Sequence, residues 1–167
     1  LNHGKNLLAY EVAKTYVKRV LDYDLRAVKA GKTVTPKELE GELCANLSVK
    51  SGDKTYDVRI KGIADRIDQL SDGTVRVIDY KTGSFDKTTI IKNETALEAN
   101  KADNAFQLLV YGLMYKAENP SQNEIQPTVF FLRAKEIESP IGVVLEKQEL
   151  SSEEQVEFTK SKVTEVL

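Results

Sequence analysis

Two aspartates and a lysine stand in strand-like segments where apolar residues are the usual choice. Asp79 and Lys81 belong to the run at residues 77–81, and Asp65 belongs to the run at 62–68, one short turn earlier. Strands deplete Asp and Lys, so these three residues call for a chemical explanation. Alternate residues of a strand share one face, so Asp79 and Lys81 point together. Neighbouring antiparallel strands bring facing residues within about 5 Å, so Asp65 can approach Asp79 across the hairpin.

Two carboxylates this close repel each other, and a divalent cation between them removes that penalty. Hard oxygen ligands of this kind suit Mg²⁺ or Mn²⁺. Lys81 would stand beside the metal, where its charge can help activate water or stabilise a phosphoryl oxygen. The three side chains therefore suit metal-dependent hydrolysis of a phosphodiester bond. The plainer alternative for the same residues is a surface ion-pair network.

Three motifs extend this pattern along the chain. They are Gly62-x-x-Asp65-Arg66-x-Asp68, Asp79-Tyr80-Lys81-Thr82-Gly83 and Gln107-x-x-x-Tyr111. In this order they resemble the PD-(D/E)xK nuclease superfamily, and within it the RecB/AddB-type nuclease domain of helicase–nucleases. The resemblance covers roughly residues 42–134.

The resemblance implies a role for each residue of the strand motifs. Asp65 and Asp79 would bind the metal, with the carbonyl of Tyr80 as a further ligand. Lys81 would be the catalytic lysine. Members of the family often have another acidic or histidine ligand on an upstream helix, and His3 does not lie in a convincing version of that motif. Glu42, at the start of a strand, is either an extra metal ligand or an exposed acid.

The third motif implies residues near the same site. Gln107 and Tyr111 lie one helical turn apart, where they would contact DNA or support Lys81. Each also has a purely structural alternative, since Gln107 can cap a backbone group and Tyr111 can belong to the core. Two interpretations of Arg66 stay open, namely a contact with a DNA phosphate and a structural salt bridge with Asp68.

The hydrophobic pattern predicts the elements that must position these residues. It indicates helix, three antiparallel strands, helix, one or two strands and a last helix, which is an α/β (α+β) fold with a central mixed sheet flanked by helices. This order matches the restriction-endonuclease-like αβββαβ core of the family. The predicted helices are 5–30, 103–118 and 151–167, the predicted strands are 42–50, 55–63, 74–80, 127–134 and 141–145, and the intervening segments are a connector at 36–42 and a long loop at 83–100.

Composition narrows the function further. The chain has 167 residues and a net charge of −2, which fits one soluble domain spanning 1–167 and argues against binding nucleic acid through overall charge. Its single cysteine, Cys44, excludes a four-cysteine iron–sulfur cluster within the chain. No apolar run is long enough to span a membrane. Lys87, Lys92 and Lys101 border the long loop and either follow a phosphate backbone or are simply solvated.

The sequence therefore predicts a Mg²⁺- or Mn²⁺-dependent DNA nuclease. The expected setting is an exonuclease of DNA repair or recombination in a prokaryotic cytoplasm, with DNA as its substrate and a helicase domain or subunit as its partner. The chain lacks an initial Met, so we expect a piece of a longer protein. Two alternatives stay open, namely a non-catalytic DNA- or partner-binding module of the same fold and a small-molecule phosphohydrolase.

Overall fold

The computed structural model describes residues 4–83, 90–91, 103–134, 137–140, 142–145 and 148–166. Its elements, in chain order, are α1 (Lys5–Lys29), β1 (Val34–Ser51), β2 (Lys54–Leu70), β3 (Val75–Lys81), β4 (Ile90–Ile91), α3 (Asp103–Glu118), β5 (Ile125–Phe131), β6 (Glu138–Pro140), β7 (Gly142–Leu145), β8 (Gln148–Glu149) and α4 (Ser152–Val166). Among these described residues, no helix is long and apolar enough to cross a bilayer.

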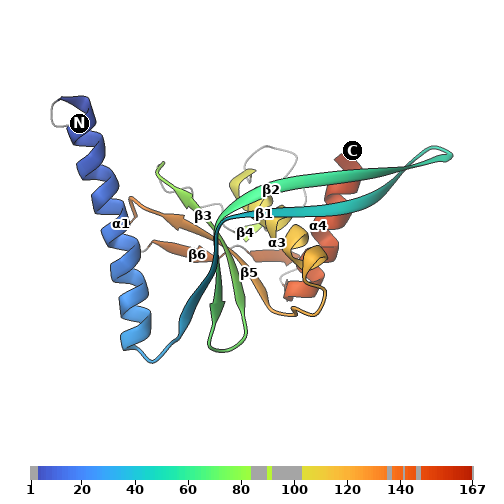
Figure 1. Ribbon diagram of the computed structural model, residues 1–167. Helices are drawn as coiled ribbons and strands as arrows, with labels where there is room; N and C mark the ends of the chain where they lie inside the picture. Colours follow the sequence, from blue (N-terminus) through green and yellow to red (C-terminus); the bar gives the residue numbers. More distant parts are fainter. Residues whose placement is uncertain are drawn as a thin grey trace.

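The main sheet is mixed and five-stranded, in the order β1-β2-β3-β5-β6. The first three strands form an antiparallel meander, and β5 then lies parallel to β3. Helix α1 stands on one side of the sheet, and α3 and α4 lie on the other (Figure 1). The predicted α+β fold, with a central mixed sheet between helices, is therefore confirmed.

Helix α3 is the main support behind the sheet. Its buried residues pack against β1, β2, β3 and β5, and they are Ala105, Leu108, Leu109, Leu113 and Met114. The last helix begins with a capping box, in which the Ser151 N–H donates to Glu154 Oε2 at 2.8 Å and Ser151 Oγ accepts from the Glu154 N–H at 3.4 Å. Both helices thus form where local sequence and burial agree.

Several boundaries differ from the predictions. The predicted connector at 36–42 is part of β1, because Pro36 sits in an edge strand that can spare its missing N–H, next to a register shift between Pro36 and Glu38. Strand β2 continues through Gly62 to Leu70 instead of stopping there. The strand predicted at 141–145 exists as β7, but it pairs with β4 and β8 in a separate small sheet. Most of the predicted loop at 83–100 lies outside the described residues.

The β1–β2 pair bends sharply where it leaves the rest of the sheet, and its tip projects beyond α3 and α4 (Figure 1). Along β2 the residues facing α3 are Ile60, Gly62 and Ala64, and then Ile67, so the alternation shifts by one residue after Ala64. On β1 the residue at this corner is Glu40, whose φ of 52° is unusual for a residue other than glycine. The corner places Asp65 at the exact bend of its strand.

Gly62 permits the close approach of α3 to β2. A Cβ atom there would lie 2.7 Å from Tyr111 Cε1 and 2.8 Å from Met114 Cε.

We expect Gly62→Ala to lower the free energy of unfolding by about 1–3 kcal/mol, because the ring of Tyr111 must shift. Urea denaturation measures the change. Gly83→Ala is the control, since its Cβ would meet nothing within 4 Å, and an equal loss in both variants would contradict this account.

Candidate active site

The candidate site forms where β2 and β3 stop pairing. The last ladder pair is Arg66 with Ile78, and the same register continued by one step sets Asp65 opposite Asp79. At that point β2 bends away, and Asp65 Oδ2 accepts a 2.6 Å hydrogen bond from the backbone N–H of Tyr80. The carboxylate takes the place of the strand carbonyl that an uninterrupted ladder would supply. Asp65 is thereby fixed at the end of the ladder, next to Asp79.

The carbonyl of Tyr80 faces the same place. In a strand, the N–H and C=O of one residue point to the same edge and those of the next residue to the other. The Tyr80 N–H is directed toward β2, whereas the carbonyl of Lys81 accepts from Leu132 N on the β5 side at 2.9 Å. The Tyr80 carbonyl therefore points toward Asp65, into the space from which β2 has turned away.

Asp79 is the more buried of the two carboxylates, with 10% of its side chain exposed. Its Oδ2 lies 2.9 Å from Lys81 Nζ, but this ion pair is poorly aligned, and the buried oxygen has no hydrogen-bond partner within the described part of the chain. Burial raises the pKa of Asp79, Lys81 partly opposes that rise, and the negative charge of Asp65 adds to it. The folded chain thus holds a carboxylate whose charge is incompletely compensated.

Lys81 is held between two elements. Its Nζ donates to Gln107 Oε1 at 3.2 Å, and Gln107 Nε2 donates to Tyr111 Oη at 2.8 Å. The Tyr111 hydroxyl fixes the orientation of the amide, so that the carbonyl end of Gln107 must face the lysine. The structure therefore brings Lys81, Gln107 and Tyr111 together in one hydrogen-bonded chain from β3 to α3.

The oxygen atoms at this corner fit a hard divalent cation. Two carboxylates and one backbone carbonyl face one another, and Asp79 Oδ2 is a buried acceptor without a donor in good geometry. Among the described residues, no third Asp, Glu, His or Cys joins them in a metal-binding cluster. His3 lies outside the described residues. Glu42 is exposed and lines a separate groove with Cys44, Arg59, Lys61 and Glu118.

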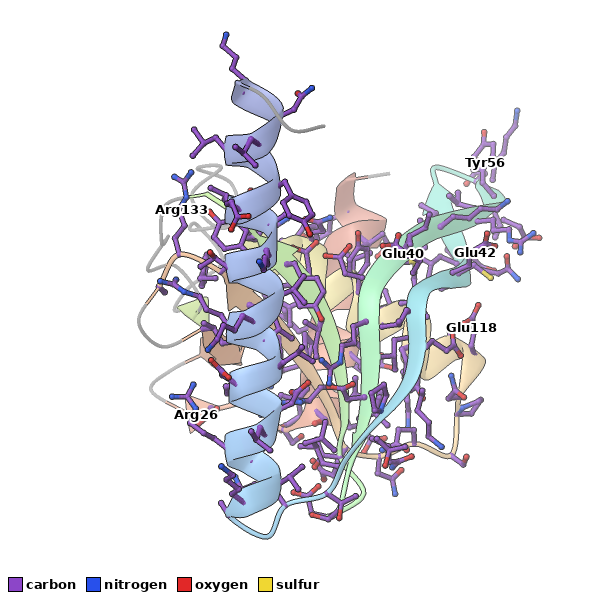
Figure 2. The ribbon with its side chains drawn as sticks, turned by 60° about the vertical axis from the view of Figure 1, so that its left-hand side comes forward. Arg26, Glu40, Glu42, Tyr56, Glu118 and Arg133 are labelled. Carbon is purple, nitrogen blue, oxygen red and sulfur yellow. The ribbon has the colours of Figure 1, made fainter. Side chains whose placement is uncertain are left out.

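Figure 2 shows Glu42 on the β1–β2 ribbon above Glu118, on the side away from α1. The backbone N–H of Cys44 donates to Glu118 Oε1 at 3.0 Å, which ties the end of α3 to this edge strand. The structure thus favours the exposed-acid alternative for Glu42. Lys87, Lys92 and Lys101 all lie outside the described residues.

The side chain of Arg66 is held inside the fold by two aspartates. Only 6% of its side chain is exposed. Its Nε lies 2.6 Å from Asp68 Oδ1 and its Nη1 lies 2.7 Å from Asp24 Oδ2. The structural salt bridge is the alternative that the structure supports, extended by a partner on α1.

The motifs did not predict the remainder of this ionic cluster. Asp68 Oδ2 also accepts from Arg76 Nη2 at 2.8 Å, and Arg76 lies over the rings of Tyr23 and Phe130, at 5.8 and 5.7 Å from their centroids. The one sequence signal was Arg76 in the middle of an apolar strand. Tyr23 and Asp24 come from α1, and Asp24 precedes Arg66 by 42 residues, so no local pattern connects them.

A comparison with known protein families adds an independent observation. A family model described as the PD-(D/E)XK nuclease superfamily matches residues 5–167. The chain belongs to this superfamily.

The other comparisons give little further information about this PD-(D/E)XK chain. No curated protein matches it. A solved structure titled "Crystal structure of SSO0001" is similar, with 20% identity over 90% of this chain, 59% of the other chain and a TM-score of 0.36. This chain therefore corresponds to little more than half the length of that protein. Membership of the PD-(D/E)XK superfamily suggests a nuclease, and the more specific activity must be argued from the site.

The raised pKa of Asp79 gives a stability prediction for the metal-free PD-(D/E)XK chain. Between the ordinary pKa of a carboxyl group and the raised native value, the folded state binds more protons than the unfolded chain. The free energy of unfolding therefore falls as pH rises through this window. We expect Asp79→Asn to flatten this dependence and to be at least as stable as the wild type at pH 7.

Chemical denaturation in EDTA at several pH values measures the effect. Asp53→Asn, an exposed residue at the β1–β2 turn, is the control and should change stability by less than about 0.5 kcal/mol. A lower stability of Asp79→Asn at pH 7, with an unaltered pH dependence, would show that Asp79 is not strained by its burial.

Proposed function

We propose that this chain is a Mg²⁺- or Mn²⁺-dependent deoxyribonuclease domain of the RecB/AddB type. The observation that carries the proposal is the meeting of Asp65, Asp79 and Lys81 at the end of the β2–β3 ladder. The wider proposal is an exonuclease of DNA repair or recombination that acts with a helicase domain or subunit.

Asp65 and Asp79, with the carbonyl of Tyr80, are the groups that would hold the cation. The N–H of Tyr80 occupies Asp65 Oδ2, which leaves Oδ1 to serve as a ligand. A divalent cation held here would supply Lewis-acid polarisation of a phosphate oxygen and a more acidic water. The two carboxylates then contribute charge at fixed positions, since neither needs to reorganise during the reaction.

Lys81 is the cation that the chain itself supplies. With 27% of its side chain exposed, its Nζ lies 2.9 Å from Asp79 Oδ2 and 3.2 Å from Gln107 Oε1. From this position it can orient an attacking water, take part in its deprotonation or stabilise charge on a phosphoryl oxygen. Gln107 acts through Lys81 as a positioning residue, and Tyr111 fixes the amide of Gln107.

The first test is the loss of cleavage on substitution of the site. We expect Asp79→Ala to abolish Mg²⁺-dependent degradation of DNA, and Lys81→Ala to reduce its rate on the order of 10²–10⁴-fold. Labelled duplex and single-stranded oligonucleotides, with and without EDTA, measure this. Lys18→Ala is the matched control, because Lys18 is exposed on α1 and pairs only with Asp22 in the described structure.

Cleavage by Asp79→Ala at the wild-type rate would contradict the assignment. A wild-type protein that binds DNA but never cleaves it, in either metal, would instead identify a binding module of the same fold.

Ionic strength separates DNA from a small substrate. Contacts with several phosphates release counterions, so the KM for an oligonucleotide should rise by at least about tenfold between 50 and 200 mM salt. Steady-state cleavage across this salt range measures the effect. A KM independent of salt, together with turnover of a small phosphodiester, would indicate a small-molecule phosphohydrolase.

A further inference from the structure

Two consecutive residues of β2, Asp65 and Arg66, bind side chains or backbone of other elements at the point where the β2–β3 ladder ends. Asp65 accepts from the backbone N–H of Tyr80, and Arg66 pairs with Asp24 of α1, with 2.7 Å between Nη1 and Oδ2. Backbone pairing between the strands ends at Arg66 with Ile78. Beyond that pair, the side chain of Asp65 holds the Tyr80 N–H where the ladder no longer does, and Tyr80 lies between Asp79 and Lys81.

The guanidinium of Arg66 is held from several directions. Asp24 Oδ2 lies 2.7 Å from Nη1 and Asp68 Oδ1 lies 2.6 Å from Nε. Asp68 is fully buried, and its second oxygen lies 2.8 Å from Arg76 Nη2. A planar fork with several donors can meet partners in different directions at once, which a lysine ammonium cannot reproduce. Arg66 is therefore fixed in one rotamer, on the residue next to a candidate metal ligand.

We propose that Arg66 is a positioning residue that fixes the Asp65–Tyr80 corner, and that Asp24 makes helix α1 part of this support. The proposal rests on the metal-dependent function proposed above. Because Arg66 follows Asp65 directly, movement of its backbone moves the carboxylate. Because Asp65 in turn accepts from the Tyr80 N–H, displacement of its carboxylate also loosens the β3 segment that carries Asp79 and Lys81.

The first variant is Arg66→Lys, which keeps the positive charge but loses the fork. We expect Mn²⁺ affinity to fall about tenfold, as is usual when a group supporting a metal ligand is removed, and kcat to fall with it. The KM for DNA and its salt dependence should stay unchanged, since Arg66 is buried. Isothermal titration calorimetry with Mn²⁺ alone measures the affinity, and oligonucleotide cleavage measures kcat and KM.

The second variant is Asp24→Asn, which alters one partner of Arg66 on the half-buried inner side of α1. Asp22→Asn is the matched control, because Asp22 is an exposed acid on the same helix that pairs with Lys18 at 2.9 Å. We expect a loss of about threefold to tenfold in Mn²⁺ affinity for Asp24→Asn and no change for Asp22→Asn. Thermal unfolding of each variant shows that the titrations are made on folded protein.

If Arg66→Lys and Asp24→Asn both unfold at lower temperatures but bind Mn²⁺ with wild-type affinity, the proposal is overturned. The salt bridge between Arg66 and Asp24 would then be purely structural. An unchanged affinity with a weaker salt dependence of KM would also overturn it, by making Arg66 a DNA contact. A wild-type protein that shows no Mn²⁺ binding dependent on Asp65 would instead remove the proposed function, and the positioning role with it.

Discussion

The hydrogen bond from the Tyr80 N–H to Asp65 is the interaction on which the candidate site depends. A backbone N–H left without an acceptor inside a protein is costly, and the bend of β2 removes the carbonyl that would normally accept it. The carboxylate of Asp65 fills this role at 2.6 Å. The bend and the site are thus one feature, because Asp65 supplies the acceptor that the ladder lacks at the bend and is also the residue opposite Asp79.

The two faces of the sheet at this corner carry different balances of charge. On the face with Asp79 and Lys81, two carboxylates meet one ammonium group, which leaves a net negative charge. The cluster around Arg66 has two aspartates and two arginines, so its formal charges cancel. Buried charges are tolerated only when they are paired and hydrogen-bonded. The uncompensated charge is therefore confined to the place where a cation would bind.

Local sequence rules predicted the parts of this arrangement that depend on short spacing. The period of two in strands placed Asp79 and Lys81 on one face, and the short turn between the two strand segments placed Asp65 opposite. The bend was not predictable in the same way. Glu40 adopts a positive φ that its residue type does not favour, and Pro36 normally signals the end of a strand. Tertiary pairing of β1 with β2 overrides both local signals.

Helix α1 shows the same limit for residues far apart in the sequence. Its apolar periodicity correctly predicted a helix, yet within Lys5–Lys29 no residue is buried, and Leu8, Val17 and Leu21 are exposed. The side that faces the sheet carries the half-buried Tyr16, Val20 and Tyr23, which pack against the cluster that contains Phe130 and Leu132. Polar contacts add to this packing, with Arg19 donating to the carbonyl of Leu132 at 2.6 Å and Asp24 pairing with Arg66. The hydrophobic pattern therefore identifies this helix, but it does not separate the apolar residues that face the sheet from those that stay exposed. The orientation of α1 brings one of its acids, Asp24, to Arg66, the residue beside Asp65.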